Sequence, residues 1–285
     1  MSKRFPWKRA SWVGWVALAV GALLLAGCLL GENGMKRFQK PSDEVSIRED
    51  THAPVWQNSL GMVFRPVPEH RAQMCIWEAR IMDFAAFVAD TGYDATQGAW
   101  TYVDDQWVQQ GYCWSNTGYR VTSQHPVCAI SWDDAMAFCA WLTERERADG
   151  SITGGQRYRL PTEQEWAAAA GIPLNHVRSE LPPDVKKSLY LGNFHWLLGV
   201  DPFEFTAPVG SFMPNPYGFH DMAGNVWEYC LDDAGDGTRV IRGGAWLNRS
   251  DYYATASARG RSRENIRSVL YGFRVVLGQV NTEFE

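Results

Sequence analysis

The feature of this chain that most constrains its fold is the shortage of long helical patterns. From about residue 58 to 278 the sequence is rich in Gly, Pro, Asn and aromatic residues, without a long series of apolar residues at helical spacing or an internal repeat. Short strand-like pieces, such as residues 239–241 and 273–276, lie between these turn-forming residues. Since the chain also has 14 Trp residues, we expect an α+β domain with few helices, short strands and long ordered loops, held together by aromatic packing.

Three segments do carry helix signals. Ser131 is a candidate N-cap, with Asp134 in the first turn and apolar residues at helical spacing after it. Thr162 and Glu165 form a capping-box pattern, in which the hydroxyl accepts from the third N–H and the carboxylate accepts from the N–H of the cap residue. Residues 83–89 are a third candidate. These signals predict three short helices within the α+β domain.

The first 30 residues predict export. Four basic residues, Lys3, Arg4, Lys8 and Arg9, precede an uncharged and mainly apolar stretch at residues 12–30, and small residues stand just before Cys28. This order is typical of a secretory signal. Cys28 resembles the cysteine of a lipobox, which implies cleavage before it, lipidation of its thiol and a membrane-anchored lipoprotein of the bacterial cell envelope. The alternative is a single transmembrane anchor, because 19 residues fall within the spanning range of about 17–25. Both interpretations place the body outside the cytoplasm.

The predicted organisation has four parts. Residues 1–27 are the signal, residues 28–57 a polar lipid-anchored tether, residues 58–278 one globular domain, and residues 279–285 a short tail. Removal of the four basic residues of the signal from the total of 27 leaves 23 basic against 32 acidic residues, a net charge of −9. Because nucleic-acid affinity comes largely from Lys and Arg that neutralise phosphates, we expect no nucleic-acid partner.

Five cysteines follow Cys28. No CxxC pattern occurs among them, which argues against a zinc ribbon or a thioredoxin-like site. Export permits disulfides without requiring them in a domain of this size, so we expect each to be a buried structural residue. They are Cys75, Cys113, Cys128, Cys139 and Cys230.

Four segments, in order, carry a family resemblance. They are residues 125–127 with 131–135, residues 159–166, residues 208–210 through 215–219 to 224–228, and residues 239–246 closed by 272–274. Together they resemble the formylglycine-generating enzyme (sulfatase-modifying factor) domain, and the resemblance covers about residues 59–278. It implies an irregular α+β fold related to C-type lectin domains, in agreement with the sparse helices expected above.

The resemblance also implies a departure in chemistry. In catalytic family members, a copper-dependent oxidase converts a substrate cysteine to formylglycine, and two thiolates just after the Gly-Gly segment hold Cu(I). Matching Gly243 and Gly244 to that pattern puts Asn248 and Tyr253 at the two cysteine positions, and no cysteine follows Cys230. Soft Cu(I) selects sulfur ligands, which an amide and a phenol cannot replace. We therefore expect no bound copper, no catalytic residue and no formylglycine formation by the family mechanism.

For the calcium sites of the family, by contrast, this sequence has an oxygen-bearing side chain at each position that the resemblance requires. The resemblance carries one site onto the side chains of Asn193 and Asp201 with the carbonyls of Phe194 and Phe203, and a second onto the side chains of Asp221 and Glu228 with the carbonyls of Gly224 and Val226. Such oxygens suit Ca²⁺, which takes about 6–8 of them. We expect a structural Ca²⁺ that locks long loops. The alternative is that these are solvated loop acids or hydrogen-bonding caps.

Two groups of residues are candidates for a ligand surface. The insert at residues 98–119 carries Trp100, Trp107 and Trp114 among polar residues, and aromatic loops recognise peptides or sugars well. Arg259 and Arg261 belong to an arginine-rich stretch that suits a carboxylate or sulfate. The alternatives are rings that belong to the core and arginines of a solvated loop.

Three functions therefore remain from sequence alone. The favoured one is an envelope-anchored, non-catalytic domain that binds a peptide, protein or glycan through the surface that catalytic relatives use for substrate. The second is a related oxidase with a different metal ligand set. The third is a structural accessory lipoprotein of an envelope assembly, which would be marked by stable co-purification with partners.

Overall fold

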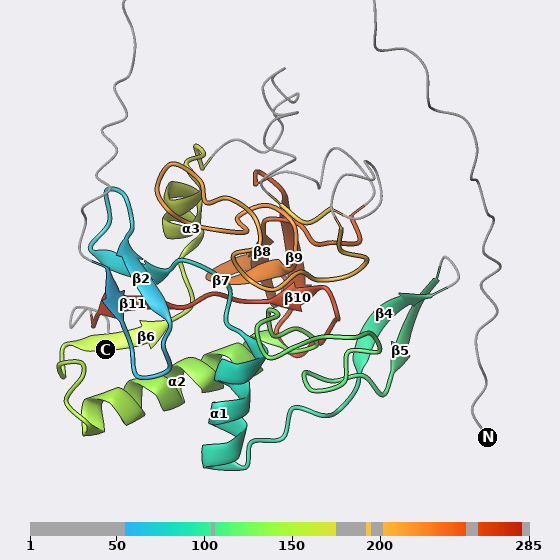
Figure 1. Cartoon of the computed structure of the whole chain (residues 1–285), viewed down its shortest axis with the longest axis horizontal. Helices are drawn as coiled ribbons and strands as arrows, with labels where there is room; N and C mark the ends of the chain where they lie inside the picture. Colours follow the sequence, from blue (N-terminus) through green and yellow to red (C-terminus); the bar gives the residue numbers. More distant parts are fainter. Residues whose placement is uncertain (1–54, 104–105, 175–191, 195–201, 249–255, 281–285) are drawn as a thin grey trace, which may run out of the picture. The chain divides into compact units, whose positions relative to one another are not determined.

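In the part of the chain that the computed structural model describes, the folded body consists of short strands in two main sheets together with three helices (Figure 1). The structure describes residues 55–103, 106–174, 192–194, 202–248 and 256–280. The helices are α1 (Ile81–Thr91), α2 (Trp132–Ala148) and α3 (Glu163–Ala170). The strands are β1 (Trp56–Gln57), β2 (Val63–Pro66), β3 (Ala72–Cys75), β4 (Ala99–Val103), β5 (Gln106–Gln110), β6 (Gln156–Arg159), β7 (Trp227–Gly235), β8 (Thr238–Arg242), β9 (Arg259–Arg263), β10 (Tyr271–Gly272) and β11 (Val276–Gln279). The predicted α+β class is confirmed.

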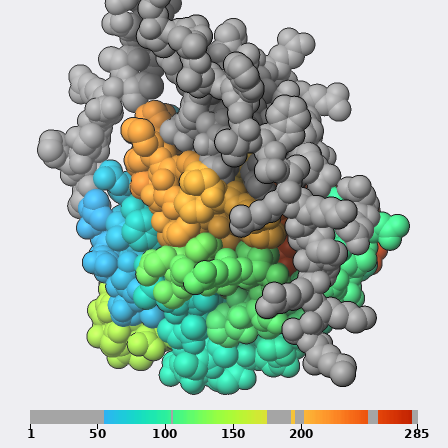
Figure 2. Space-filling view, turned by 45° about the vertical axis from the view of Figure 1, so that its right-hand side comes forward, coloured from blue at the N-terminus to red at the C-terminus, as the bar shows by residue number. Residues whose placement is uncertain are grey.

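The sheets join segments that are far apart in the sequence. One sheet has the order β1-β2-β3-β11-β6 and is antiparallel throughout, so the last strand lies between an early and a middle one. The second has the order β10-β7-β8-β9, in which β10 pairs with β7 in parallel. The β4–β5 hairpin stands apart from both (Figure 1). In the space-filling view, the blue surface of β1–β3 and the yellow-green surface around β6 lie on one side of the body (Figure 2).

The helix signals read from the sequence are confirmed. At the start of α2, the Ser131 hydroxyl accepts from the Asp134 N–H at 3.2 Å, and the Asp134 carboxylate accepts from the Ser131 N–H at 2.8 Å. Thr162 and Glu165 make the same reciprocal pair at the start of α3, at 3.2 and 2.9 Å. The third helix, α1, begins at Ile81, two residues before the predicted segment. These caps satisfy N–H groups that a helix leaves free at its first turn.

Aromatic side chains form much of the core, as expected. Phe138 of α2 is fully buried and packs against Phe84 and Phe87 of α1, with ring centroids 6.1 and 5.9 Å apart. It also meets Trp141 and Phe273 at 5.6 and 5.4 Å. Such offset and edge-to-face pairs stabilise a core beyond the area that they bury. One aromatic cluster therefore joins α1, α2 and the chain that enters β11.

Two sequence-based assignments need correction. The strand predicted at residues 273–276 is wrong for three of its four residues, because β11 starts only at Val276. Phe273 and Val275 instead accept, through their carbonyls, from the N–H groups of Ala79 and Cys75, both at 2.8 Å. The boundaries also differ, since the sheet begins at Trp56, two residues before the predicted domain start, and ends at Gln279, one residue after the predicted end.

The predicted signal and tether up to residue 54, including Cys28, lie outside the described residues. Among the residues that the structure does describe, no helix is long and apolar enough to cross a membrane.

Candidate functional site

Three acidic side chains and one arginine form a buried polar cluster behind the loop that precedes β7. Glu78, Asp221, Glu228 and Arg274 each have at most 2% of their surface exposed. Arg274 donates from Nε and Nη2 to the two carboxylate oxygens of Glu228, each at 2.6 Å, and Trp166 donates to Glu228 Oε2 at 2.7 Å. With all four groups ionised the cluster would carry two more negative than positive charges. Buried charges of this kind are normally neutralised or coordinate a metal.

The electrostatics of the cluster reflect that excess. Burial raises the pKa of Asp221 to about 6. The N–H of Gly210, which donates to Asp221 Oδ2 at 2.7 Å, acts in the opposite direction and lowers this pKa by a smaller amount. Burial, and then the charge of Asp221, raise the pKa of Glu78 well above its usual value. Burial acts to lower the pKa of Arg274, but the charge and hydrogen bonds of Glu228 outweigh it, so that this pKa is raised. Glu228 thus has its cation, whereas the ionised forms of Glu78 and Asp221 are disfavoured.

Asn225 connects the cluster to two other segments. Its Nδ2 donates to Glu78 Oε1 at 3.0 Å, its Oδ1 accepts from the Ala207 N–H at 2.9 Å, and its N–H donates to the Asn193 carbonyl at 3.1 Å. Gly224, at φ +85°, permits this approach, because a Cβ there would lie 2.4 Å from the Asn193 oxygen. The two segments that the resemblance assigns to separate calcium sites therefore pack directly against each other.

Among the described residues, several buried side-chain oxygen atoms have no hydrogen-bond partner, and three of them belong to this region. They are Glu78 Oε2, Asn193 Oδ1 and Asp221 Oδ1. Leaving a buried acceptor without a donor costs about 1–3 kcal/mol, and more for a charged group, and carboxylate and amide oxygens are the ligands that Ca²⁺ prefers. The donor set on Asn193 and Asp221 thus fits the predicted cation.

The other predicted calcium ligands differ in burial and in how many hydrogen bonds they already accept, and one of them lies outside the described residues. Glu228 Oε2 already accepts from Arg274 and Trp166, which leaves Oε1, with one accepted hydrogen bond, as the more available oxygen. Phe194 is buried and Phe203 is half-buried, while Asp201 lies outside the described residues. Val226 is fully buried beside Gly224. In the described part of the chain, no group of three or more His, Cys, Asp or Glu side chains is arranged to hold a metal by itself.

The Gly-Gly segment forms a fixed turn after β8. The Gly243 carbonyl accepts from the Gly224 N–H at 2.8 Å, and the Trp246 N–H donates to the Asn225 carbonyl at 3.0 Å. Asn248 closes the turn, since its Oδ1 accepts from the Ala245 N–H at 2.6 Å. Tyr253, the second position that the resemblance assigns to a copper ligand, lies outside the described residues.

An aromatic cluster lies next to this turn. The rings of Tyr119 and Phe205 stack at 4.5 Å, and both meet the Trp246 ring edge-on, at 5.7 and 5.0 Å. Trp246 is buried, whereas Tyr119 and Phe205 are partly exposed. The cluster therefore presents apolar surface beside Asn248.

The five cysteines after Cys28 are buried free thiols, as predicted. Burial raises the pKa of Cys75 and of Cys128 to about 12, and raises those of Cys139 and Cys230 as well. A thiol must ionise to act as a nucleophile or metal ligand. These environments are therefore typical of inert structural cysteines.

The three predicted ligand-binding tryptophans lie in different environments. Trp107 of β5 is 49% exposed and contacts Tyr102 edge-on, with centroids 5.3 Å apart. Trp100 lies on the paired strand β4 and is half-buried. Trp114 packs against the core ring of Phe84 at 5.4 Å. The exposed aromatic surface of the insert is therefore centred on the β4–β5 hairpin, and the core alternative describes Trp114.

The two predicted ligand-binding arginines also differ. Arg259 is held by Glu163, which accepts from its Nε at 2.6 Å and from its Nη2 at 3.0 Å. Arg261 is 61% exposed and lies 3.8 Å from Asp236. Of the pair, Arg261 is the one whose guanidinium is available to solvent.

Sequence reasoning missed Glu78 and Asn225 as site residues. Glu78 follows the apolar residues of β3 and stands alone among them, and a single acid in a buried run is a usable signal. Asn225 stood in a recognised motif, but its contact with Glu78 spans 147 positions in the chain. Only the folded arrangement brings these two side chains together.

Comparison with known proteins agrees with this fold. The model of the sulfatase-modifying factor enzyme 1-like domain matches residues 73–278. The chain belongs to this family.

Sequence relatives include catalytic and inactive proteins. The formylglycine-generating enzyme of Thermomonospora curvata is 34% identical over 182 residues, covering 52% of this chain and 55% of that protein. The inactive C-alpha-formylglycine-generating enzyme 2 of Mus musculus is 35% identical over 156 residues, covering 52% of this chain and 46% of that protein. The chain thus matches about half the length of these curated relatives.

Solved structures support the fold alone. The structure of PvdO from Pseudomonas aeruginosa superimposes with a TM-score of 0.55 at 20% identity, covering 84% of this chain and 89% of that one. Treponema denticola variable protein 1 gives 0.50 at 19% identity, covering 79% and 92%.

Proposed function

We propose that this protein is a non-catalytic member of the sulfatase-modifying factor family that binds a peptide, protein or glycan beside the Gly-Gly turn. The observation that carries the proposal is the chemistry of that turn. The side-chain oxygen of Asn248 accepts a hydrogen bond from the Ala245 N–H, and no cysteine follows Cys230 in the sequence. The residues present do not fit Cu(I), because the family's thiolates have no sulfur substitute here. The neighbouring rings of Tyr119 and Phe205 supply contact area for a ligand.

A structural role for calcium forms part of the proposal. The proposed ligands are those of the two family sites, Asn193 with Asp201 in one and Asp221 with Glu228 in the other. A bound cation would remove the cost of leaving Asn193 Oδ1 and Asp221 Oδ1 buried without a partner among the described residues. The bound ion would supply positive charge to a cluster with one arginine against three carboxylates. It would thereby fix the segments around residues 193 and 224 against each other.

We also propose that the chain is exported and held in the bacterial envelope by lipidation of Cys28. The order of basic residues, apolar stretch and small residues before Cys28 supports this. A lipid anchor would confine the ligand-binding domain to the membrane surface.

The test uses one peptide and two measurements. A sulfatase-type peptide with the pattern Cys-x-Pro-x-Arg is incubated with the copper-loaded protein and followed by mass spectrometry, and its binding is measured separately by calorimetry. We expect binding without aldehyde, and weaker binding in Phe205→Ala. Aldehyde that forms in proportion to protein concentration would overturn the non-catalytic assignment. The double variant Asn248→Cys with Tyr253→Cys then asks whether only the metal ligands differ from those of catalytic relatives.

A further inference from the structure

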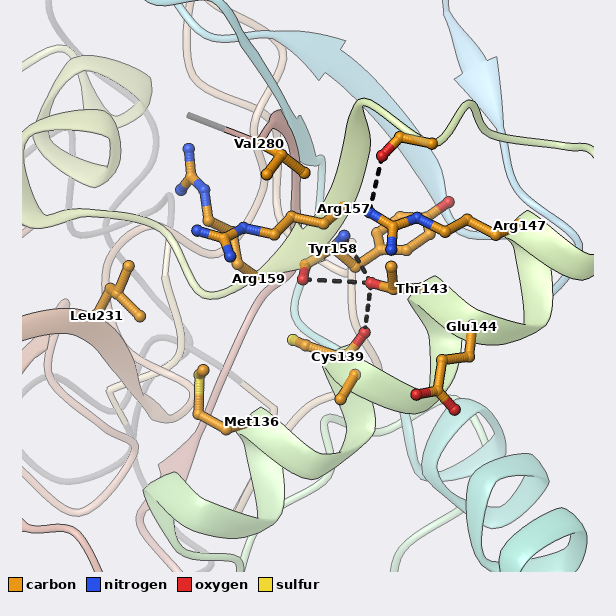
Figure 3. A pocket seen from close by; sticks show the side chains of 12 residues that line it. Met136, Cys139, Thr143, Glu144, Arg147, Arg157, Tyr158, Arg159, Leu231 and Val280 are labelled. Carbon is orange, nitrogen blue, oxygen red and sulfur yellow. Dashed lines mark hydrogen bonds between the residues drawn. The ribbon is translucent and has the colours of Figure 1, made fainter. Parts of the chain in front are cut away.

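A pocket that the proposed function does not use lies between α2 and β6. Its volume is about 540 Å³, it opens to the surface, and its wall combines arginine side chains with apolar ones (Figure 3). Arg147 comes from α2, Arg157 and Arg159 from β6, and Leu231 and Val280 close the far side. Pockets of about 300–1,000 Å³ are the usual size for ligand sites.

Strand geometry explains why two arginines reach this pocket. Alternate residues of a strand point to opposite faces, so Arg157 and Arg159 share one face of β6 while Tyr158 between them is buried in the core. Both arginines extend toward Leu231 and Val280, and Arg147 enters from the other end (Figure 3). The sheet itself thus places positive charge along the pocket.

Two of these three guanidinium groups have no carboxylate partner among the described residues. Arg159 is neutralised by Glu165, with two contacts of 2.6 and 2.7 Å. Arg147 donates to backbone carbonyls of residues 154 and 156, at 3.2 and 2.6 Å, which leaves its charge uncompensated. Arg157 is exposed, and its guanidinium group makes no hydrogen bond or ion pair with the part of the chain that the structure describes. The acid on the pocket wall is Glu144, itself exposed.

The edge of β6 is closed to strand addition. The Tyr158 N–H donates to the Thr143 hydroxyl at 2.9 Å, and the carbonyl of Gln156 accepts from Arg147. A ligand therefore cannot extend the sheet at this edge and must be recognised through side chains. A guanidinium group beside apolar surface matches a carboxylate next to an apolar side chain.

We propose that this pocket is a binding site for an acidic peptide segment, with a carboxylate against the guanidinium group of Arg157 and a neighbouring apolar side chain against Leu231, while the charge of Arg147 adds attraction from the other end of the pocket. It is separate from the Gly-Gly turn and involves neither copper nor calcium. Glu144 opposes the ligand charge and therefore limits the affinity.

The experiment compares two synthetic peptides, acetyl-Ser-Glu-Leu-Glu-Ser-amide and its Gln-for-Glu counterpart, by calorimetry on the full chain. We expect only the Glu peptide to bind, and we expect its affinity to fall as the NaCl concentration rises. Arg157→Gln should weaken it about tenfold, the size of one charge-assisted hydrogen-bonding contact, and Glu144→Gln should tighten it. Arg71→Gln, a matched loss of an exposed arginine outside the pocket, should leave affinity unchanged.

Three results would overturn the proposal. The first is equal binding of the two peptides, and the second is an Arg157→Gln variant that binds like the parent protein. The third is displacement of the bound Glu peptide by inorganic phosphate at a concentration no higher than that of unlabelled Glu peptide needed for the same displacement, which would indicate a site for free anions. Ala140→Glu provides an independent variant, because Ala140 is exposed on the α2 side of the pocket and Glu is a good helix former. It should abolish binding without lowering the melting temperature, and unchanged binding would also contradict the site.

Discussion

Replacing Arg274 by Met should be one of the most destabilising single changes in this domain. The side chain is fully buried and donates four hydrogen bonds to described residues, two to Glu228 and one each to the carbonyls of Cys75 and His220. Met fills a similar space but makes none of them, so that the Glu228 carboxylate remains buried without its cation. Removal of one partner of a buried ion pair costs about 3–5 kcal/mol.

Urea and thermal unfolding measure this cost. For a domain of this size, about 2–4 °C in melting temperature corresponds to 1 kcal/mol, so we expect Arg274→Met to melt about 6–20 °C lower. The urea midpoint should fall with an unchanged dependence on urea concentration. Arg261→Met is the matched control, because the same substitution at an exposed arginine should change the free energy of unfolding by less than about 0.5 kcal/mol.

A double-mutant cycle separates the ion pair from lost packing. Adding Glu228→Gln to Arg274→Met removes the unpaired charge, so the double variant should be more stable than the sum of the two single effects predicts. A single variant within about 1 kcal/mol of the parent protein, or strictly additive effects, would refute the claim that Arg274 neutralises Glu228.

Four further predictions test the remaining assignments. Chelation should lower the melting temperature and calcium should restore it, by about 2.7 kcal/mol at a hundredfold excess over Kd, and Asp221→Ala should remove this response; a melting curve indifferent to both would exclude the cation. Ser131→Ala should cost about 1 kcal/mol in urea unfolding through loss of the α2 cap. Phe138→Ala should cost about 3–5 kcal/mol, since its ring contacts four others; a smaller loss would show that the core collapses into the space. Cys28→Ala should leave the precursor uncleaved and without acyl label, and unchanged acylation would point to a plain membrane anchor.

Local features of the fold could be predicted from the sequence because their determinants are close together. The caps at Ser131 and Thr162 involve residues three positions apart, and β8 lies where residues 239–241 suggested it. The strand at residues 273–276 could not be placed, because the residues that pair with it come from β3 and β6. Its ends depend on contacts that span most of the chain.

The candidate site was predictable in part for the same reason. The motif at residues 221–228 indicated a loop with oxygen-bearing side chains, and the carboxyl groups of Asp221 and Glu228 are indeed buried. Among the described residues, Asp221 Oδ1 has no hydrogen-bond partner, and neither has Oε2 of Glu78, which lies outside the motif. The role of Arg274 as the cation for Glu228, and the approach of Asn225 to Glu78, follow from strands that meet only after folding. Composition predicted the negative net charge of −5 but not the basic pocket beside α2. That pocket exists because alternate residues of β6 point to the same face, which places Arg157 and Arg159 together.

The shape of the Gly-Gly turn does not depend on the side chain at position 248. The turn is held by backbone bonds from Gly224 to Gly243 and from Trp246 to Asn225, and neither bond involves the side chain at position 248. Gly243 adopts φ +91°, which a residue with a side chain rarely tolerates, so the conformation is set by the glycine. Asn248 adds one side-chain hydrogen bond to Ala245, whose loss costs about 0.5–1.5 kcal/mol. The scaffold of this region thus depends on the glycine and on Asn225, and a change of copper ligands would alter the chemistry while leaving the fold in place.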